Sequence, residues 1–191
     1  MCFQKKMPTV TELALPGLKL VRVPCMVDER GWFSESWQRE DWLKIGITAD
    51  FMQDNLVMND AAGILRGLHW QNAPHAQTKL VRCLSGAVRD VVLDLRRESP
   101  TYRRWAALTL TADAGDALLV PQGFAHGYVT LMPKTLVLYK VDHPWMPGSE
   151  AACRWNDPNL GIDWGVTDPI LSEKDAAAPL LNEVLGSAES A

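Results

Sequence analysis

Short runs in which apolar and polar residues alternate dominate the chain and predict a mainly β protein. Residues 18–27 (LKLVRVPCMV) are predicted to form a strand, residues 28–31 (DERG) a turn, and residues 32–37 (WFSESW) the next strand. Further predicted strands cover residues 51–58, 64–71, 78–84, 87–95, 106–110, 117–120, 127–131 and 135–141. Strands at this spacing, with no helices between them, favour a jelly-roll sandwich or barrel.

Helices are expected at few places, mostly towards the C-terminus. Residues 40–45 are predicted to form one short helix that Gly46 ends. Ser172 and Asp175 are spaced for an N-cap arrangement, and residues 179–185 are predicted to form a closing helix. We therefore expect a single domain over residues 1–191, with its core at 9–182.

Composition and charge narrow the class of protein. The 191 residues are 47% hydrophobic and 22% charged, which is ordinary for one globular domain. A net charge of -4 argues against a nucleic-acid surface, so an anionic ligand needs a local basic pocket. The sequence contains no apolar run of about 18 residues that could span a bilayer.

Cysteine use and the first residues favour the cytoplasm. Cys2, Cys25, Cys83 and Cys153 are widely scattered and form no CxxC motif, so reduced thiols are expected. Residues 1–8 (MCFQKKMP) lack the apolar core of a signal peptide. We expect a soluble cytoplasmic protein with no membrane or nucleic-acid partner.

The stretch GILRGLHWQ at residues 63–71 carries the first candidate chemistry, because it places Arg66 and His69 within an apolar strand. Strict alternation would point these two side chains to opposite faces of the sheet. Gly67 lies between them, and an isolated strand glycine often marks a bulge that re-aims a side chain. Both could then enter one cavity, although a hydrogen-bonded core histidine beside a structural arginine explains the stretch equally well.

A second motif lies in GDALLVPQGFAH, residues 115–126, with the spacing G-x5-P-x-G-x2-H. It resembles the second motif of the cupin superfamily, which implies a cupin-type jelly roll and an inward-pointing His126. In metal-binding cupins the place of Gln71 would hold a second histidine. The amide, together with the ammonium of Lys79 nearby, disfavours a divalent cation, so we expect no metal. His75 lies in a polar loop and is more simply a solvated residue.

Three further polar positions lie in apolar strands. Lys79 begins a strand, where a lysine commonly snorkels to solvent. Asp90 and Asp94 share one strand face, and either could partner a histidine. Tyr139 is either a packing residue or, if it faces a histidine across a cavity, a proton donor.

Segments along almost the whole chain, from about residue 9 to 181, resemble the dTDP-4-dehydrorhamnose 3,5-epimerase family, the enzymes of the third step of dTDP-rhamnose synthesis. In order they are DERGWFSES, QDN at residues 53–55, LRGLHWQ, KLVRCLSGAVRDVVLDLR, VPQGFAHGY, LYK, WND at residues 155–157, and LSEKDAAAPLL. Agreement of this many short segments in the same order is a specific signal.

The resemblance implies a metal-free homodimeric epimerase that acts on dTDP-4-dehydro-6-deoxy-D-glucose at C3 and C5. Such an enzyme needs no cofactor, because the substrate's own carbonyl is the electron sink. The resemblance makes His69 the general base, Asp175 its orienting carboxylate, Tyr139 the general acid and Lys79 the partner of the C4 oxygen. The residues that it implies for substrate binding are Arg30, Glu35, Gln53, Asn55, Arg66, His126, Trp145, Glu150 and Lys174. The family more often has tyrosines where HPWMP stands here, so Trp145 departs from the pattern as the residue that stacks on thymine.

Other functions compete with this one. A mono-epimerase that inverts only C3 or only C5 would share the same base and pocket. A non-catalytic cupin could bind a nucleotide sugar, although the presence of base, acid and lysine together counts against it. A metal-dependent cupin is disfavoured by Gln71.

Overall fold

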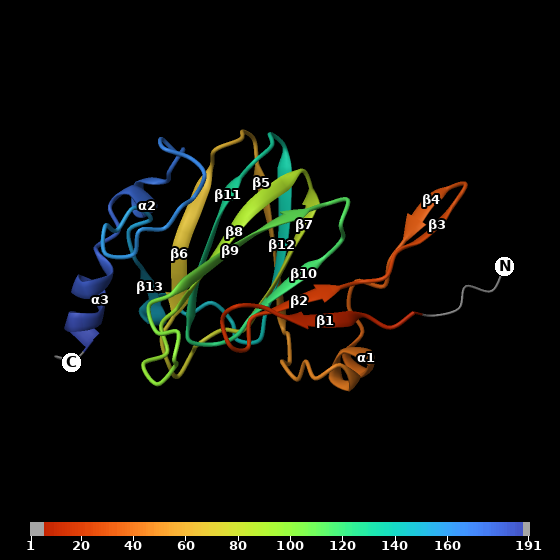
Figure 1. Ribbon diagram of the computed structural model, residues 1–191, viewed down its shortest axis with the longest axis horizontal. Helices are drawn as coiled ribbons and strands as arrows, with labels where there is room; N and C mark the ends of the chain where they lie inside the picture. The colour runs from red at the N-terminus through yellow and green to blue at the C-terminus, as the bar shows by residue number, and fades with distance from the viewer. Residues whose placement is uncertain (1–5, 189–191) are drawn as a thin grey trace.

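Two antiparallel sheets face each other in the computed structural model, which describes residues 6–188 (Figure 1). The first sheet contains, in order, β1 (Thr9–Glu12), β2 (Lys19–Arg22), β10 (Ala117–Val120), β7 (Lys79–Ser85), β12 (Thr135–Val141) and β5 (Gln53–Asn59). The second contains β13 (Glu150–Ala152), β6 (Leu65–Gln71), β11 (Phe124–Thr130), β8 (Ala87–Asp94) and β9 (Trp105–Thr111). The predicted jelly roll is confirmed.

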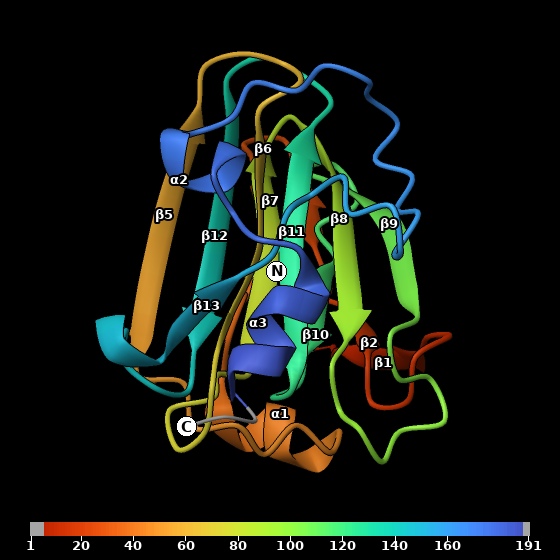
Figure 2. The ribbon, with the colours of Figure 1, turned by 90° about the vertical axis from the view of Figure 1, so that its left-hand side faces the viewer.

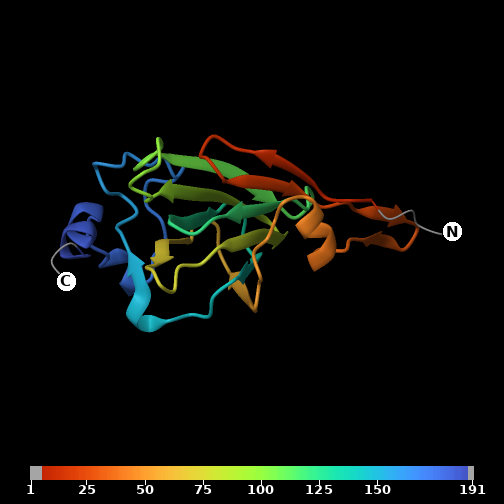
Figure 3. The ribbon, with the colours of Figure 1, turned by 90° about the horizontal axis from the view of Figure 1, so that it is seen from below.

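Short elements surround this barrel. They are the hairpin β3 (Met26–Asp28) and β4 (Gly31–Phe33), and the helices α1 (Arg39–Lys44), η1 (Pro147–Ser149), α2 (Glu173–Ala176) and α3 (Leu181–Ala188). The hairpin projects from the end of the molecule opposite α3 in two views (Figures 1 and 3). Figure 2 shows α2, α3 and β13 together on the other side. None of the helices within residues 6–188 has the length and apolar character needed to cross a bilayer.

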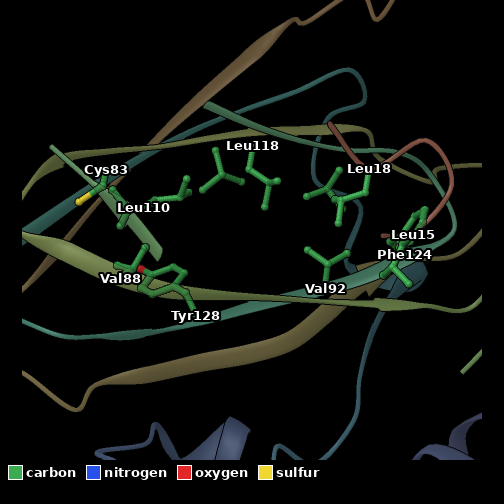
Figure 4. Close-up of a cluster of buried hydrophobic side chains, with 12 residues drawn as sticks. Leu15, Leu18, Cys83, Val88, Val92, Leu110, Leu118, Phe124 and Tyr128 are labelled. Atoms are coloured by element: carbon green, nitrogen blue, oxygen red, sulfur yellow. The ribbon is translucent and has the colours of Figure 1, made fainter. Parts of the chain in front are cut away.

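The main core lies between the two sheets (Figure 4). Alternation along each strand sends one set of side chains inward, so Val81 and Leu118 from the first sheet meet Val92 and Phe124 from the second. Full burial of such a side chain contributes about 1.5–3 kcal/mol. The barrel wall is therefore stiff enough to hold polar side chains at fixed positions in its interior.

The outer face of the second sheet is also covered. Leu65, Leu68 and Trp70 of β6 pack there in one cluster with Trp164 and Leu181 of the C-terminal segment. Although β6 is buried on both sides, Arg66 and His69 keep partial exposure, and they alone do so along this strand. The C-terminal segment thus completes the fold and brings α2 against β6.

Most predicted strands are confirmed, and the deviations have local causes. The strand predicted over residues 18–27 is divided into β2 and β3, with Pro24 between them, because proline has no N–H for the ladder. The strand predicted for residues 32–37 ends at Phe33. The strand predicted over residues 127–131 begins earlier, at Phe124 of β11, because the turn ends with the PQG segment at residue 123. Strands β1 and β13 were not predicted from their short, weakly alternating sequences.

The helical predictions are confirmed, and the closing helix predicted over residues 179–185 is α3, which begins at Leu181. Helix α1 covers Arg39–Lys44, and α2 is capped by Ser172, whose hydroxyl accepts a hydrogen bond from the backbone N–H of Asp175. Cys25, Cys83 and Cys153 are free thiols. Cys2 and the start of the predicted N-terminal segment lie outside the described residues.

Candidate active site

A bulge in β6 turns Arg66 and His69 to the same side. Gly67 has φ +128°, and a Cβ on it would lie 2.6 Å from the Cα of Gly127, so the close approach of the strands needs glycine there. The register between β6 and β11 shifts at this point. The bulge predicted from the isolated glycine is confirmed, and both side chains line one cavity.

This cavity of about 300 Å³ lies between the two sheets, and α2 closes one side. It is lined by Val57, Arg66, His69, Lys79, His126, Tyr128, Tyr139, Ser172, Lys174 and Asp175. The structure thus brings together all four side chains predicted to be catalytic and three of those predicted to bind substrate. The size is at the lower end of the range for small-molecule sites.

His69 is held by Asp175. The two atoms Nε2 of His69 and Oδ1 of Asp175 lie 2.6 Å apart, and the hydroxyl of Ser172 donates to the other carboxylate oxygen at 2.7 Å. Burial alone would raise the pKa of Asp175, but the hydrogen bonds from His69 and Ser172 outweigh it and lower that pKa. Asp175 therefore stays ionised and fixes the orientation of the imidazole.

A second histidine–aspartate pair lies on the neighbouring strands. Nε2 of His126 is 2.9 Å from both carboxylate oxygens of Asp90, and both residues are buried. The two candidates for the partner of His69 are thereby separated: Asp175 contacts His69, and Asp90 contacts His126. Asp94 instead binds the side chains of Arg96, Ser99 and Thr101 and organises the β8–β9 loop.

Lys79 projects inward from the start of β7 and donates to the backbone oxygen of His69 at 3.2 Å. Burial lowers its pKa to about 8, while the charges of Asp90 and Glu150 act in the opposite direction. The simple expectation of a lysine snorkelling to solvent is wrong for this residue. An ammonium with so few hydrogen bonds in a buried cavity is well placed to meet a negative charge that appears on a ligand.

Tyr139 enters the cavity from β12, in the sheet opposite His69. Burial raises the pKa of its phenol, although the nearby Arg66 guanidinium lowers it in part. Arg66 is itself held by Asn59, whose side-chain oxygen accepts from its Nε at 2.9 Å. Tyr139 therefore keeps its proton at neutral pH and is available as a donor.

Sequence reasoning missed several members of this group. Tyr128 lines the cavity, and its hydroxyl lies near the amide of Asn59. Period-2 alternation from His126 along β11, and from Asn55 along β5, would have indicated both residues. In the sequence, a tyrosine and an asparagine within these strands are equally compatible with packing and surface positions.

The rim of the cavity carries further predicted residues. Glu150 and Lys174 form an ion pair at 2.7 Å, and Lys174 lines the cavity. Burial opposes ionisation of Glu150, but Lys174 and a hydrogen bond from the Trp145 side chain lower its pKa. Gln53 binds Asn55 at 2.9 Å on β5 beside this rim.

Two predicted substrate-binding residues are not brought to this cavity. Arg30 and Glu35 are exposed, and neither lines it. Arg30 lies in the turn of the β3–β4 hairpin, where it forms an ion pair with Asp28. Within one chain their predicted role has no geometric support.

The interior does not suit a divalent metal. Gln71 uses both its oxygen and its nitrogen in hydrogen bonds to the backbone, and each cavity histidine is engaged by its own aspartate. Lys79 adds positive charge beside them. Among residues 6–188 there is no group of three or more His, Cys, Asp or Glu side chains placed to hold a metal ion.

The fold and this cavity define a cupin-type jelly roll whose interior carries a histidine–carboxylate pair, a buried lysine and a tyrosine. Comparison with known proteins refines the class. A family model described as dTDP-4-dehydrorhamnose 3,5-epimerase matches residues 12–183. The chain belongs to the dTDP-4-dehydrorhamnose 3,5-epimerase family, as its motifs predict.

Individual relatives agree over nearly their full lengths. The dTDP-4-dehydrorhamnose 3,5-epimerase of Salmonella typhimurium is 42% identical over 94% of this chain and 98% of its own. The Bacillus anthracis enzyme, crystallised with TDP and PPi bound, is 45% identical, with a TM-score of 0.89 over 91% of this chain and 99% of its own. The Legionella pneumophila enzyme in complex with dTDP-4-keto-L-rhamnose is 38% identical, with a TM-score of 0.86 over 92% of this chain and 93% of its own.

Proposed function

We propose that this protein epimerises dTDP-4-dehydro-6-deoxy-D-glucose at C3 and C5 to dTDP-4-dehydro-L-rhamnose, by proton abstraction next to the C4 ketone. The observation that carries the proposal is the placement of His69 and Tyr139 on opposite sheets, with Lys79 in the same cavity. The membership of the family and the ligands named for its crystallised relatives support the same substrate.

His69 acts as the general base in this proposal. The protons on C3 and C5 are acidified by the ketone between them, so one base next to the sugar ring can remove either. Asp175 holds the Nε2 side of the imidazole, and Nδ1 is then the nitrogen that takes the proton. Asp175 also stabilises the imidazolium that forms. General base help of this kind accelerates a reaction by roughly 100- to 10,000-fold.

Lys79 stabilises the enolate. Removal of either proton moves charge to the C4 oxygen, and a preorganised cation beside that oxygen favours the transition state over the neutral ketone. The lysine is already desolvated by the barrel wall, so little reorganisation is needed when charge develops. No cofactor is required, because the substrate carbonyl accepts the electron pair.

Tyr139 returns a proton from the opposite face. Its raised pKa keeps the phenol protonated at neutral pH, and its origin on the first sheet faces it towards the second. Protonation on the face opposite the base inverts the carbon. Arg66 and Lys174 supply positive charge for the diphosphate, for which an arginine is suited by its paired N–H groups.

We also propose that the protein is a homodimer and is cytoplasmic. The β3–β4 hairpin exposes Trp32 by 69% and Phe33 by 62%, which is unusual for a surface that stays in water. A second copy that covers this hairpin would bring Arg30 to a cavity other than that of its own chain. The free thiols and the nucleotide-sugar substrate fit the cytoplasm.

NMR of the nucleotide sugar with enzyme in deuterated water tests the function. Deuterium at both C3 and C5 together with the L-rhamno product supports the proposal. Deuterium at one position only would identify a mono-epimerase, and no deuterium with intact binding would identify a nucleotide-sugar-binding protein. Sedimentation of the wild-type protein tests the dimer separately.

A further inference from the structure

The loop that follows β12 places an aromatic side chain at the rim of the cavity. Trp145 is 56% exposed, and its side chain hydrogen-bonds Glu150, which forms the ion pair with Lys174 in the cavity wall. At this exposure little besides the contact with Glu150 and the backbone of the loop can fix the indole. The position of the indole therefore depends on how the backbone at residues 144–146 is held.

Gln71 holds that backbone from below. It lies two residues after His69 on β6, on the same inner face, and is 5% exposed. Its side-chain nitrogen donates to the oxygen of Pro144 at 3.2 Å and to the oxygen of His75 at 2.6 Å. Its side-chain oxygen accepts from the N–H of Met146 at 2.7 Å. Gln71 thus hydrogen-bonds the loop backbone immediately before and immediately after Trp145.

The chemistry of the amide explains why this residue is a glutamine. Two carbonyls and one N–H converge on it, so a side chain here must donate twice and accept once, and only one orientation of the amide satisfies all three groups. An imidazole, which stands at this place in metal-binding cupins, has only two ring nitrogens and cannot do so. A carboxylate would face two carbonyl oxygens without a proton to offer.

Other side chains nearer to the surface also contact this loop. Gln53 accepts from the N–H of Trp145 at 3.3 Å, and Nδ1 of His75 lies 3.1 Å from Nε2 of His143. Gln77 donates to the oxygen of His143 at 2.8 Å. These contacts lie nearer to solvent, whereas Gln71 is buried and connects the loop directly to the strand of His69.

We propose that Gln71 is a positioning residue, which fixes the loop 143–146 and with it the exposed Trp145 at the rim of the cavity before the nucleotide sugar arrives. This inference rests on the proposed function for the identity of the ligand. The side-chain hydrogen bonds of Gln71 go to the backbone of His75, Pro144 and Met146, and it does not line the cavity. A loop ordered before the ligand arrives spares the binding step the entropy of ordering it, so the effect falls on binding rather than on chemistry.

The test replaces Gln71 by Met, which has similar length and volume but no hydrogen bonds. We expect the Kd for dTDP and the KM for the nucleotide sugar to rise about tenfold, with kcat within about twofold of the wild type. If kcat falls as much as kcat/KM, or if neither Kd nor KM changes, the inference is wrong.

A double-mutant cycle with Trp145→Ala separates positioning from a general loss of structure. Because Gln71 acts through Trp145, Gln71→Met should change the Kd for dTDP by less than about twofold when Trp145 is already Ala. Fully additive losses would contradict the inference. Gln71→Glu keeps the acceptor for Met146 and serves as a second variant if Gln71→Met does not fold; it should raise the Kd in the same direction, and an unchanged Kd overturns the inference.

A control removes a side-chain amide near the same loop. Gln122 is exposed and donates to Asp142 at 3.3 Å without touching residues 143–146, so Gln122→Ala should leave the Kd for dTDP unchanged. Failure of the proposed function shows itself separately, because a wild-type protein that binds dTDP but incorporates no deuterium still allows the cycle to be measured. A wild-type protein that does not bind dTDP overturns both.

Discussion

Two histidine–aspartate pairs lie side by side in this barrel, and they differ in access. His69 and His126 are register partners on β6 and β11. The imidazole of His69 is 28% exposed and its aspartate comes from the short helix α2, whereas the imidazole of His126 is 8% exposed and its aspartate comes from the adjacent strand β8. The two pairs thus have similar distances between imidazole nitrogen and carboxylate oxygen but differ in solvent exposure.

The difference indicates different work for the two pairs. A general base must contact its substrate and later release the proton that it took. The more exposed His69 can do both, whereas His126 is enclosed and less suited to proton exchange. Asp90 of the buried pair raises the pKa of Lys79 and so helps to keep that lysine charged. In the proposed reaction the accessible pair moves protons, and Asp90 of the buried pair helps to keep Lys79 charged so that it can stabilise the enolate.

Removal of the accessible imidazole should have the largest effect. We expect His69→Ala to lower the rate of exchange at both C3 and C5 by about 1,000- to 10,000-fold, because no other cavity group near it is a free base. The Kd for dTDP, measured by calorimetry, should stay within about threefold of the wild type. Exchange at a normal rate in this variant would refute the choice of base.

Lys79→Met should lower kcat by about 100- to 1,000-fold, because the enolate loses its cation. The protein should nevertheless melt at a higher temperature at pH 7. The folded pKa of about 8 lies below the usual 10.5, so the charged lysine costs stability at every pH below 8, by about 3 kcal/mol, and the cost disappears as the pH rises through 8 to 10.5. A lower melting temperature would show that Lys79 is needed for packing instead.

The same pKa predicts the alkaline limb of the wild-type profile. As the pH rises through about 8, Lys79 loses its proton in the free enzyme, so kcat/KM should fall about tenfold per unit above that value. A profile measured from pH 6 to 10 checks this. A flat profile up to pH 10 would mean that the ammonium is not required.

Tyr139→Phe should separate proton loss from inversion. The base remains, so deuterium still enters, but the donor on the opposite face is gone and formation of the L-rhamno product should fall by about 100-fold. NMR of the exchanged substrate distinguishes the two events. Unchanged rate and stereochemistry would assign the donor role to another group, such as Tyr128.

Alteration of the buried pair should have the smallest effect on rate. Asp90→Asn should lower kcat by less than about tenfold, yet it should move the alkaline limb of kcat/KM to lower pH, because Lys79 loses a negative neighbour that raises its pKa. Urea titration should also show a loss of about 1–3 kcal/mol, since the buried His126 loses a charged partner. If the alkaline limb of kcat/KM stays at the same pH in Asp90→Asn, the charge of Asp90 does not influence the pKa of Lys79.

The sequence predicts the barrel better than it predicts the cavity wall. The alternation of residues 79–85 and 87–94 locates strands directly, and Gly67 signals the bulge that brings Arg66 and His69 together. Asp175 could be connected with His69 only through family resemblance, because its contact depends on how a segment about 100 residues later folds back. Tyr128 and Asn59 could be found only by extending the period-2 alternation from His126 and Asn55, since neither residue stands out until both sheets have packed around the cavity.

The same limit applies to Gln71 and Arg30. Gln71 appears in the sequence only as a missing metal ligand, and its three backbone partners become visible when the loops are in place. Arg30 matches the family motif, yet the folded chain keeps it on the hairpin, far from the strands of its own cavity. Residue type alone does not show whether such a residue lines the cavity of its own chain.

Deuterium incorporation measured side by side for the two pairs tests the central claim most directly. Wild-type protein, His69→Ala and Asp90→Asn are each incubated with dTDP-4-dehydro-6-deoxy-D-glucose in deuterated water, and C3 and C5 are followed by NMR. We predict label at both carbons for the wild type and for Asp90→Asn, and at neither for His69→Ala. Label that survives in His69→Ala but disappears in Asp90→Asn would reverse the assignment and contradict the account.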